Sequence, residues 1–398
     1  MSTSLNTTTA SATSRAKHHS SPVVERSALP QARRIVVKVG SSSLTSIENS
    51  LDELAIATLI DVLAKAKREN PQLELILVSS GAIAAGLAPL GLARRPKDLA
   101  TQQAAASVGQ SLLMTRYTET FARYGVTVSQ VLLTADDLMA RDRYRNAHRQ
   151  LTRLLELGVM PIINENDAVA TAEVKFGDND RIAALVAHTL KADALILLSD
   201  VDALYTKHPD DGGTRIAEVR DPQELEGISI GTTGSAGVGS GGMVTKVQAA
   251  QLAAASGIPA LVTSAANARA ALAGHNVGTW FYSTGSRRSV HELWLAHLAD
   301  IRGTLTLDEG AVAAVRRRRS LLAAGVVGCA GFFDGGEALA LADEEGTVVA
   351  HGLSSYSAAE MSQMIGLHTS EIREQLGEGF DGTLVHADNL ALIHAANR

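Results

Sequence analysis

Short, uninterrupted apolar runs alternate with segments of helical spacing along most of the chain. Such runs are typical of strands that are buried on both faces of a sheet. The sequence predicts strands at residues 35–39, 73–78, 126–133, 159–163, 194–198 and 259–262, and helices at residues 51–68, 99–124, 143–156, 182–190 and 243–255. Because strands that alternate with helices favour crossover connections, we expect an α/β domain whose mostly parallel sheet is sandwiched by helices.

This pattern ends near residue 284, where a polar segment contains the turn-prone pair Gly285-Ser286. Shorter strand-like runs follow at residues 303–307, 325–333, 338–342 and 347–351, with Gly and Asp between them. They predict a small, mainly-β second domain. We therefore expect a disordered tail at 1–31, the α/β domain at 32–285, a linker at 286–302, the mainly-β domain at 303–385 and a C-terminal tail at 386–398.

The N-terminal segment 1–31 is rich in Ser and Thr and lacks the apolar centre of a secretory signal. Its low acidity and few basic residues also fit an organelle transit peptide, but a disordered tail is the simpler interpretation.

Composition narrows the possible functions. The chain has 42 acidic and 36 basic residues, a net charge of -6, so it has no overall attraction to nucleic acid or membranes. Its single cysteine, Cys329, permits no intrachain disulfide, which fits a cytoplasmic protein. No apolar run approaches the roughly 20 residues that span a bilayer.

The first two predicted strands end in loops suited to anions. Lys38 stands inside an apolar run that Gly40 follows, and burying an ammonium is costly unless it meets an anion. The alternative is a lysine at a strand edge that points to solvent. Ser80 and Gly81 end the second run and offer hydroxyl and amide donors, although an ordinary strand-to-helix turn would look the same.

Two further loops are richer in polar groups. Asn-Glu-Asn-Asp at 164–167 and Gly-Asp-Asn-Asp at 177–180 hold more polar side chains than helix capping requires. They suit an amine and carboxylate receptor, or partners for lysines and Mg²⁺. The Gly-rich segment 237–242 leads into a helix with Lys246 in its first turn, an arrangement that presents backbone N–H groups to phosphate. It is neither a Walker loop nor a dinucleotide fingerprint, and a flexible surface loop is the alternative.

Taken together, these segments resemble the amino-acid kinase family and, within it, the glutamate 5-kinase branch. The resemblance runs from about residue 33 to the C-terminus. The segments that carry it are VVKVGSSSL at 36–44, VSSGAIAAGL at 78–87, PIINENDAVAT at 161–171, KFGDNDRIAALVA at 175–187, LLSDVDALYT at 197–206 and GSGGMVTKVQAA at 239–250. The part from Gly303 onward resembles a PUA domain.

The resemblance implies an ATP-dependent transferase that phosphorylates the side-chain carboxylate of L-glutamate, the first step of proline biosynthesis, with Mg²⁺ as the cofactor of ATP. It implies a catalytic set of Lys38, Lys246, Asp180 and Lys175. It implies ATP binding by Lys38, Ser199, Asp200, Ser240, Gly241, Gly242, Met243, Val244, Thr245 and Lys246. It implies glutamate binding by Ser80, Asp167 and Asn179, and it leaves the metal ligands open. We also expect L-proline as a feedback inhibitor and a homo-oligomer.

Two alternatives come from other functional classes. A kinase of the same fold could act on a nucleoside monophosphate, but that acceptor calls for arginines near 164–167, where acids and amides dominate. An RNA-binding protein could use the second domain and the basic run at 316–319. In an acidic chain this run is more simply a solvated helix face, so we do not expect nucleic acid as a partner.

Overall fold

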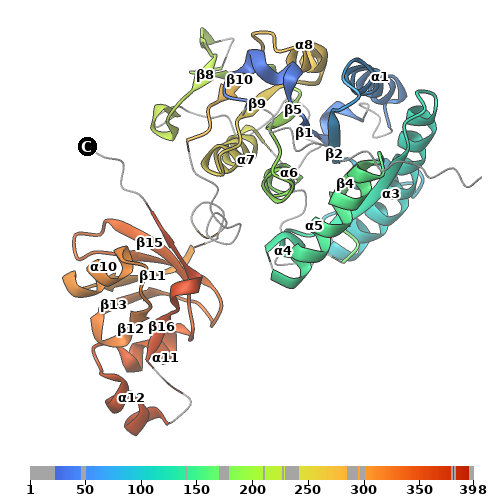
Figure 1. Cartoon of the computed structure of the whole chain (residues 1–398). Coiled ribbons are helices and arrows are strands. Elements are labelled where there is room, and N and C mark those ends of the chain that lie inside the picture. Colours follow the sequence, from blue (N-terminus) through green and yellow to red (C-terminus); the bar gives the residue numbers. More distant parts are fainter. Residues whose placement is uncertain are drawn as a thin grey trace, which may run out of the picture.

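The computed structural model describes residues 23–45, 51–139, 141–169, 179–208, 211–225, 228, 242–284, 295, 301–377, 380 and 382–393. Its largest sheet has eight strands in the order β3-β4-β2-β1-β5-β9-β10-β8 (Figure 1). These are β1 (Arg34–Val39), β2 (Glu74–Ser79), β3 (Val128–Leu133), β4 (Met160–Glu165), β5 (Ala194–Ser199), β8 (Glu218–Val219), β9 (Ala260–Ser264) and β10 (Thr279–Phe281). The six predicted strands are confirmed and pair in parallel, whereas β10 runs antiparallel to β9.

Helices cover both faces of this sheet. The five predicted helices are confirmed as α1 (Glu53–Glu69), α3 (Leu99–Ala122), α5 (Arg141–Glu156), α6 (Asn179–Thr189) and α7 (Met243–Ala255). Three short helices were not predicted: α2 (Ala82–Leu87), α4 (Ala135–Met139) and α8 (Ala268–Leu272). Along β1, Ile35 and Val37 pack with α1, α3 and α8, whereas Val36 faces the core shared with α5, α6 and α7. The sandwich is therefore confirmed, with one core on each face.

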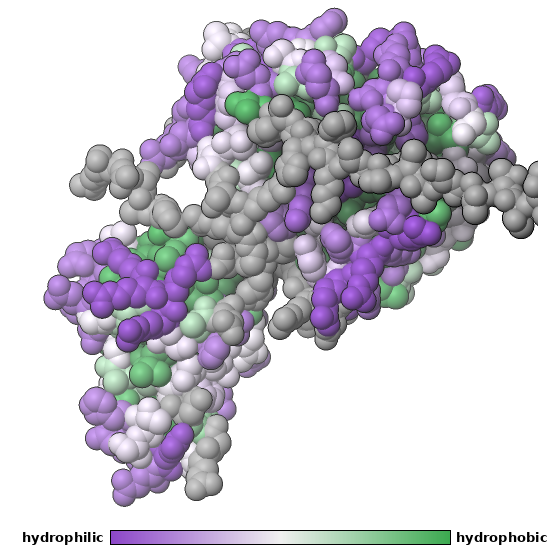
Figure 2. All heavy atoms as spheres, in the orientation of Figure 1, coloured by the Kyte–Doolittle hydropathy of each residue, from purple (hydrophilic) through white to green (hydrophobic). Residues whose placement is uncertain are grey.

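Smaller elements complete this part of the chain. The strands β6 (Leu204–Tyr205) and β7 (Arg215–Ile216) pair with each other. The 3₁₀ helices are η1 (Arg26–Gln31), η2 (Ser41–Ser43), η4 (Pro222–Leu225) and η5 (Ala265–Asn267). In Figure 2 hydrophilic residues cover the outward side of α5. Within the described residues, no helix is long and apolar enough to cross a membrane.

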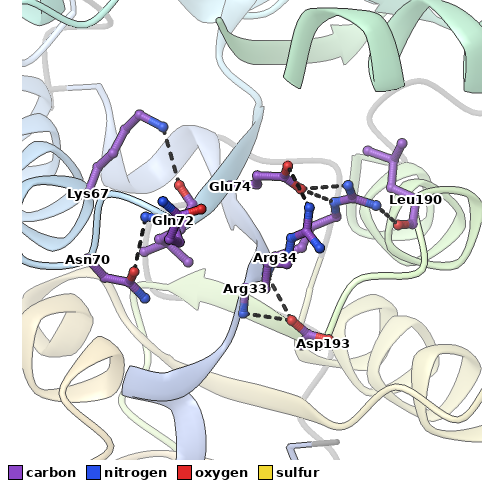
Figure 3. A network of polar contacts seen from close by, with 9 residues as sticks. Arg33, Arg34, Lys67, Asn70, Gln72, Glu74, Leu190 and Asp193 are labelled. Atoms are coloured by element: carbon purple, nitrogen blue, oxygen red, sulfur yellow. Dashed lines mark hydrogen bonds and ion pairs between the residues drawn. The ribbon is translucent and has the colours of Figure 1, made fainter. Parts of the chain in front are cut away.

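A polar network holds the amino ends of three neighbouring strands (Figure 3). The Arg34 guanidinium donates to Glu74 across the β1–β2 pair, with Nε 2.8 Å from Oε2. The Asp193 carboxylate, just before β5, accepts the backbone N–H groups of Arg33 and Arg34 at 2.7 and 2.8 Å. Because these contacts fix the strand register at one edge, the carboxyl ends align at the other edge.

The helices α2 and α3 approach each other unusually closely at two glycines. A Cβ atom on Gly86 would lie 2.0 Å from the carbonyl oxygen of Ala105, and one on Gly109 would lie 1.8 Å from that of Ala82. No other residue type fits at either place without moving a backbone. This contact fixes where Gln110, the residue after Gly109, lies relative to α2.

The second group of strands, orange and red in Figure 1, forms a five-stranded sheet in the order β13-β11-β14-β15-β17. Its strands are β11 (Ile301–Leu307), β13 (Val326–Gly331), β14 (Ala338–Ala342), β15 (Val348–Leu353) and β17 (Leu390–Leu392). The other elements are the strand pair β12 (Leu321–Leu322) and β16 (Thr383–Val385), the helices α10 (Glu309–Arg316), α11 (Ala358–Met364) and α12 (Thr369–Leu376), and the 3₁₀ helices η6 (Ala323–Gly325) and η7 (Ala387–Asn389). All four strand-like runs predicted from the sequence are confirmed.

Three predicted boundaries are wrong. The C-terminal tail expected from residue 386 includes β17, which pairs with β15 and buries Leu390. The N-terminal tail expected to end at residue 31 includes η1, where Leu29 is buried. The expected linker ends before Ile301, where β11 begins. Each segment contributes only one to three apolar side chains to a core, too few to stand out in a sequence pattern.

Candidate active site

The predicted site residues that the structure describes gather at the carboxyl edge of the eight-stranded sheet. Lys38 lies in β1 beside Val78 of β2 and Leu197 of β5. Ser80 follows β2, and Ser199 ends β5 with its Oγ donating to Asp200 Oδ1 at 2.9 Å. This is the edge at which open α/β sheets bind ligands.

Three charged side chains form a buried cluster at this edge. The Asp180 carboxylate in the first turn of α6 lies between two ammonium groups: Lys38 Nζ is 2.7 Å from Oδ1, and Lys246 Nζ is 3.5 Å from Oδ2. The three side chains are 1 to 6% exposed. Lys38 is therefore not a solvent-facing edge lysine. The cluster has two positive charges and one negative charge, so it carries an excess positive charge that suits an anion.

The lysines keep Asp180 ionised. Burial raises the pKa of its carboxyl, but Lys38 and Lys246 more than offset this, and the pKa lies below its ordinary value. Thr245 Oγ1 also donates to Asp180 Oδ2, at 2.8 Å. At neutral pH the cluster is thus a carboxylate held by two ammonium groups.

The helix α7 brings the end of the Gly-rich segment to this cluster. Gly242 is its N-terminal cap, and Met243 and Val244 begin the helix. Lys246 lies in the first turn of α7, and its Nζ also donates to the carbonyl oxygen of Gly242 at 3.5 Å. Ser240 and Gly241, within 229–241, and Lys175, within 170–178, lie outside the described residues.

A second, uncharged cluster joins three side-chain amides. Asn179 Nδ2 donates to Asn164 Oδ1 at 3.0 Å, and Asn164 Nδ2 donates to Gln110 Oε1 at 2.8 Å. The backbone N–H of Glu165 donates to the Oδ1 atoms of both asparagines, at 2.9 and 3.1 Å. Gln110 carried no sequence signal, because it is one of three glutamines in an Ala- and Gln-rich helix and nothing local distinguishes it.

Asp167 lies next to this cluster in an unusual environment. Its side chain is buried, and Oδ1 has no hydrogen-bond partner among the described residues. Burial raises its pKa to about 6, although the positive charge of Arg95 opposes the rise. The sequence showed mainly acids and amides around 164–167 and did not reveal Arg95, whose charge also acts on Glu165.

A cavity of about 190 Å³ opens beside these residues. Its lining includes Gln110, Gln130, Glu165 and Asp167. This is smaller than the roughly 300 Å³ at which drug-sized ligand pockets begin, so the cavity suits a small metabolite.

The basic run of the second domain lies outside this site. Arg316 ends α10, and Arg317, Arg318 and Arg319 follow it; all four are exposed. The interpretation of this run as a solvated surface is consistent with that exposure.

The amino acid kinase family matches residues 33–264, and the PUA domain matches residues 303–376. A glutamate 5-kinase from Streptomyces coelicolor is 56% identical over 371 residues, covering 93% of this chain and 99% of that protein. One from Thermobifida fusca is 53% identical over 371 residues, covering 92% and 95%. Among solved structures, carbamate kinase from Giardia lamblia bound to AMP-PNP matches with a TM-score of 0.46 and 17% identity, over 64% of this chain and 100% of that chain.

Proposed function

The chain belongs to the amino acid kinase family, and from this premise we propose that it is a glutamate 5-kinase with a C-terminal PUA domain. It transfers the γ-phosphoryl group of ATP to the side-chain carboxylate of L-glutamate and forms an acyl phosphate, the first step of proline biosynthesis. The observation that carries the proposal is the buried cluster of Lys38, Asp180 and Lys246, whose excess positive charge suits phosphate.

The reaction needs charge stabilisation more than proton transfer. A free glutamate side chain has a pKa of about 4.3, so the attacking carboxylate is already ionised at neutral pH and no general base is required. The obstacle is an anion that must approach a polyanion. In our proposal Lys38 and Lys246 stabilise the phosphate charge, and Asp180 holds both ammonium groups in place.

The other predicted residues keep their roles as part of this proposal. Ser199, Asp200 and the segment from Ser240 to Lys246 bind ATP, Lys175 helps to organise the centre, and Ser80, Asp167 and Asn179 bind glutamate. An ionised Asp167 in its buried setting is suited to the α-amino group of glutamate.

Mg²⁺ is expected to arrive with ATP. Asp180 is already held by two lysines and Thr245, which makes it a poor ligand for a cation. Kinases commonly bind Mg²⁺ largely through the phosphate oxygens of the nucleotide. When bound, the ion would neutralise charge on the phosphates.

An acyl-phosphate assay tests the proposed function. The purified chain is incubated with ATP, Mg²⁺ and either L-glutamate, acetylglutamate or uridylate, and acyl phosphates are trapped as hydroxamates while ATP consumption is followed. We expect L-glutamate to be the preferred acceptor. Much faster ATP consumption with uridylate or acetylglutamate would overturn the proposal.

We further propose that L-proline inhibits the enzyme, that the chain forms a homo-oligomer and that it works in the cytoplasm. Proline shares an α-carboxylate and α-nitrogen with glutamate, so both can use the groups around Asp167 and Asn179. Proline should therefore raise the apparent KM for glutamate. Inhibition that high glutamate concentrations fail to relieve would place proline at another site.

Light scattering of the purified chain measures its mass in solution and so tests whether it forms a homo-oligomer.

A further inference from the structure

The amide cluster has a polarity that the backbone fixes. The N–H of Glu165 donates to Asn164 Oδ1 at 2.9 Å and to Asn179 Oδ1 at 3.1 Å. A backbone N–H can only donate, so both contacting atoms must be oxygens. This settles which way the two asparagine amides point, without any choice between their nitrogen and oxygen atoms.

That polarity extends outward to α3. With their oxygens on the Glu165 N–H, the asparagines must use their Nδ2 groups as donors: Asn179 to Asn164 Oδ1 at 3.0 Å, and Asn164 to Gln110 Oε1 at 2.8 Å. Gln110 must therefore present its oxygen. Its own Nε2 donates to Oε1 of Gln130, 3.1 Å away, which is an exposed residue of the edge strand β3.

These hydrogen bonds leave one N–H of the Asn179 side-chain amide available as a donor. Its Oδ1 accepts from Glu165 and one Nδ2 hydrogen is used on Asn164, while the second hydrogen has no hydrogen-bond partner among the described residues. A carboxylate accepts hydrogen bonds and cannot donate them, so this polarity suits one. The opposite polarity would present an oxygen and repel it.

We propose that Gln110 is a positioning residue: by accepting from Asn164 Nδ2 it completes the amide chain whose polarity the Glu165 N–H sets, and it thereby keeps the two asparagines in place so that Asn179 offers an N–H group to a carboxylate of the acceptor. The proposal rests on the proposed function, because it takes glutamate as the acceptor. Gln110 is well placed for the role: it lines the 190 Å³ cavity and follows Gly109, the residue at which α3 touches α2. Asn164 and Asn179 are only 1% and 3% exposed, so water cannot readily replace the Gln110 oxygen.

Two substitutions of Gln110 separate its polarity from its packing. Gln110→Met keeps the shape of the side chain but removes the acceptor, and it should raise the KM for L-glutamate roughly tenfold, the scale of one unpaired buried donor. The kcat and the KM for ATP should change less than about threefold. Gln110→Glu keeps an oxygen opposite Asn164 but adds a negative charge to the cavity lining, so its KM for L-glutamate should rise less than that of Gln110→Met and stay below about tenfold.

Gln102→Met is the matched control. Gln102 lies on the same helix, but its Nε2 donates to the carbonyl oxygen of Pro96 at 2.9 Å, outside the amide chain. The Gln102→Met variant should leave the KM for L-glutamate and the KM for ATP unchanged. An unchanged KM for glutamate in Gln110→Met, or an equal rise in Gln110→Glu, would overturn the proposal. If circular dichroism shows that Gln110→Met is not folded, the KM of Gln110→Glu for L-glutamate tests the positioning role by itself.

This experiment also distinguishes the two proposals. An unmodified chain that makes no acyl phosphate from glutamate refutes the proposed function. An unmodified chain that does so, with a Gln110→Met variant of equal KM, refutes only the positioning role of Gln110.

Discussion

Replacing the two lysines of the buried cluster one at a time should affect stability unequally and catalysis equally. The substitutions are Lys38→Met and Lys246→Met, which remove the ammonium group but keep most of the apolar stem. Both ammonium groups flank Asp180, yet Lys38 lies closer to it, at 2.7 Å against 3.5 Å. Losing the closer partner should cost more folding free energy.

The distances set the scale of the difference. With an effective dielectric constant of about 20, the attraction is ~6 kcal/mol at the shorter distance and ~5 kcal/mol at the longer one, before desolvation is counted. Breaking a buried pair costs a net of about 3 to 5 kcal/mol when it leaves a charge unpaired, but Asp180 keeps one ammonium partner in either variant. We therefore expect a stability loss below that range, with Lys38→Met about 1 kcal/mol more destabilising than Lys246→Met. Each should lower kcat by about two powers of ten, since a lost charge stabiliser costs about 3 kcal/mol in the transition state.

Urea unfolding and the hydroxamate assay measure the two effects on the same protein samples. Lys65→Met is the control, because Lys65 lies on the surface of α1, 3.8 Å from Glu69, and should change neither quantity appreciably. Two results would refute the reasoning. One is a folded Lys246→Met that keeps most of its activity, which removes Lys246 from phosphate binding. The other is a larger stability loss for Lys246→Met than for Lys38→Met, which contradicts the order of the distances.

Three further predictions concern other parts of the chain. Because burial raises the pKa of Asp167 to about 6 from 3.8, the folded chain keeps a proton that the unfolded chain has lost, so stability should fall between about pH 4 and 6. In the upper part of this range, above the pKa of about 4.3 of the substrate's own side chain, the KM for glutamate should fall as Asp167 ionises. Asp167→Asn should abolish this fall in KM, and urea unfolding should show that it also removes the loss of stability that Asp167 causes. Gly109→Ala should lower the melting temperature strongly, because its Cβ would lie 1.8 Å from a backbone oxygen, whereas Gly310→Ala, which has room in α10, should raise it slightly. A chain that ends at Arg288 should stay soluble and still phosphorylate glutamate in the hydroxamate assay, since every described site residue precedes that point; a folded but inactive truncation would contradict this.

The strands and the charged cluster were accessible from the sequence for a simple reason. A strand that is buried on both faces is apolar throughout, so the apolar run around Val36 and Val37 predicts such a strand. Lys38 is conspicuous because it interrupts such a run. Its partner Asp180 could be placed only through the family resemblance, since 142 residues separate the two positions and a sequence pattern carries no information about that pairing.

The amide cluster and the edges of the two sheets were not predictable in this way. Gln110 acts through its contact with Asn164, which depends on how closely α3 approaches α2, and nothing local in the sequence encodes that approach. Arg95 interrupts no apolar pattern, so nothing in the sequence marks it. The strand β17 is three residues long, and it exists because β15 offers it a partner, not because its own residues demand a strand.

The contact between α2 and α3 also limits how the enzyme can move. Where side chains separate two helices, the helices can slide by exchanging rotamers, but at Gly86 and Gly109 the backbones themselves touch and have no such freedom. The two helices should therefore travel as one rigid body, carrying the turn at Ser80 and the amide of Gln110 together. Any opening and closing around a substrate would then come from other elements, while this side of the site keeps its shape.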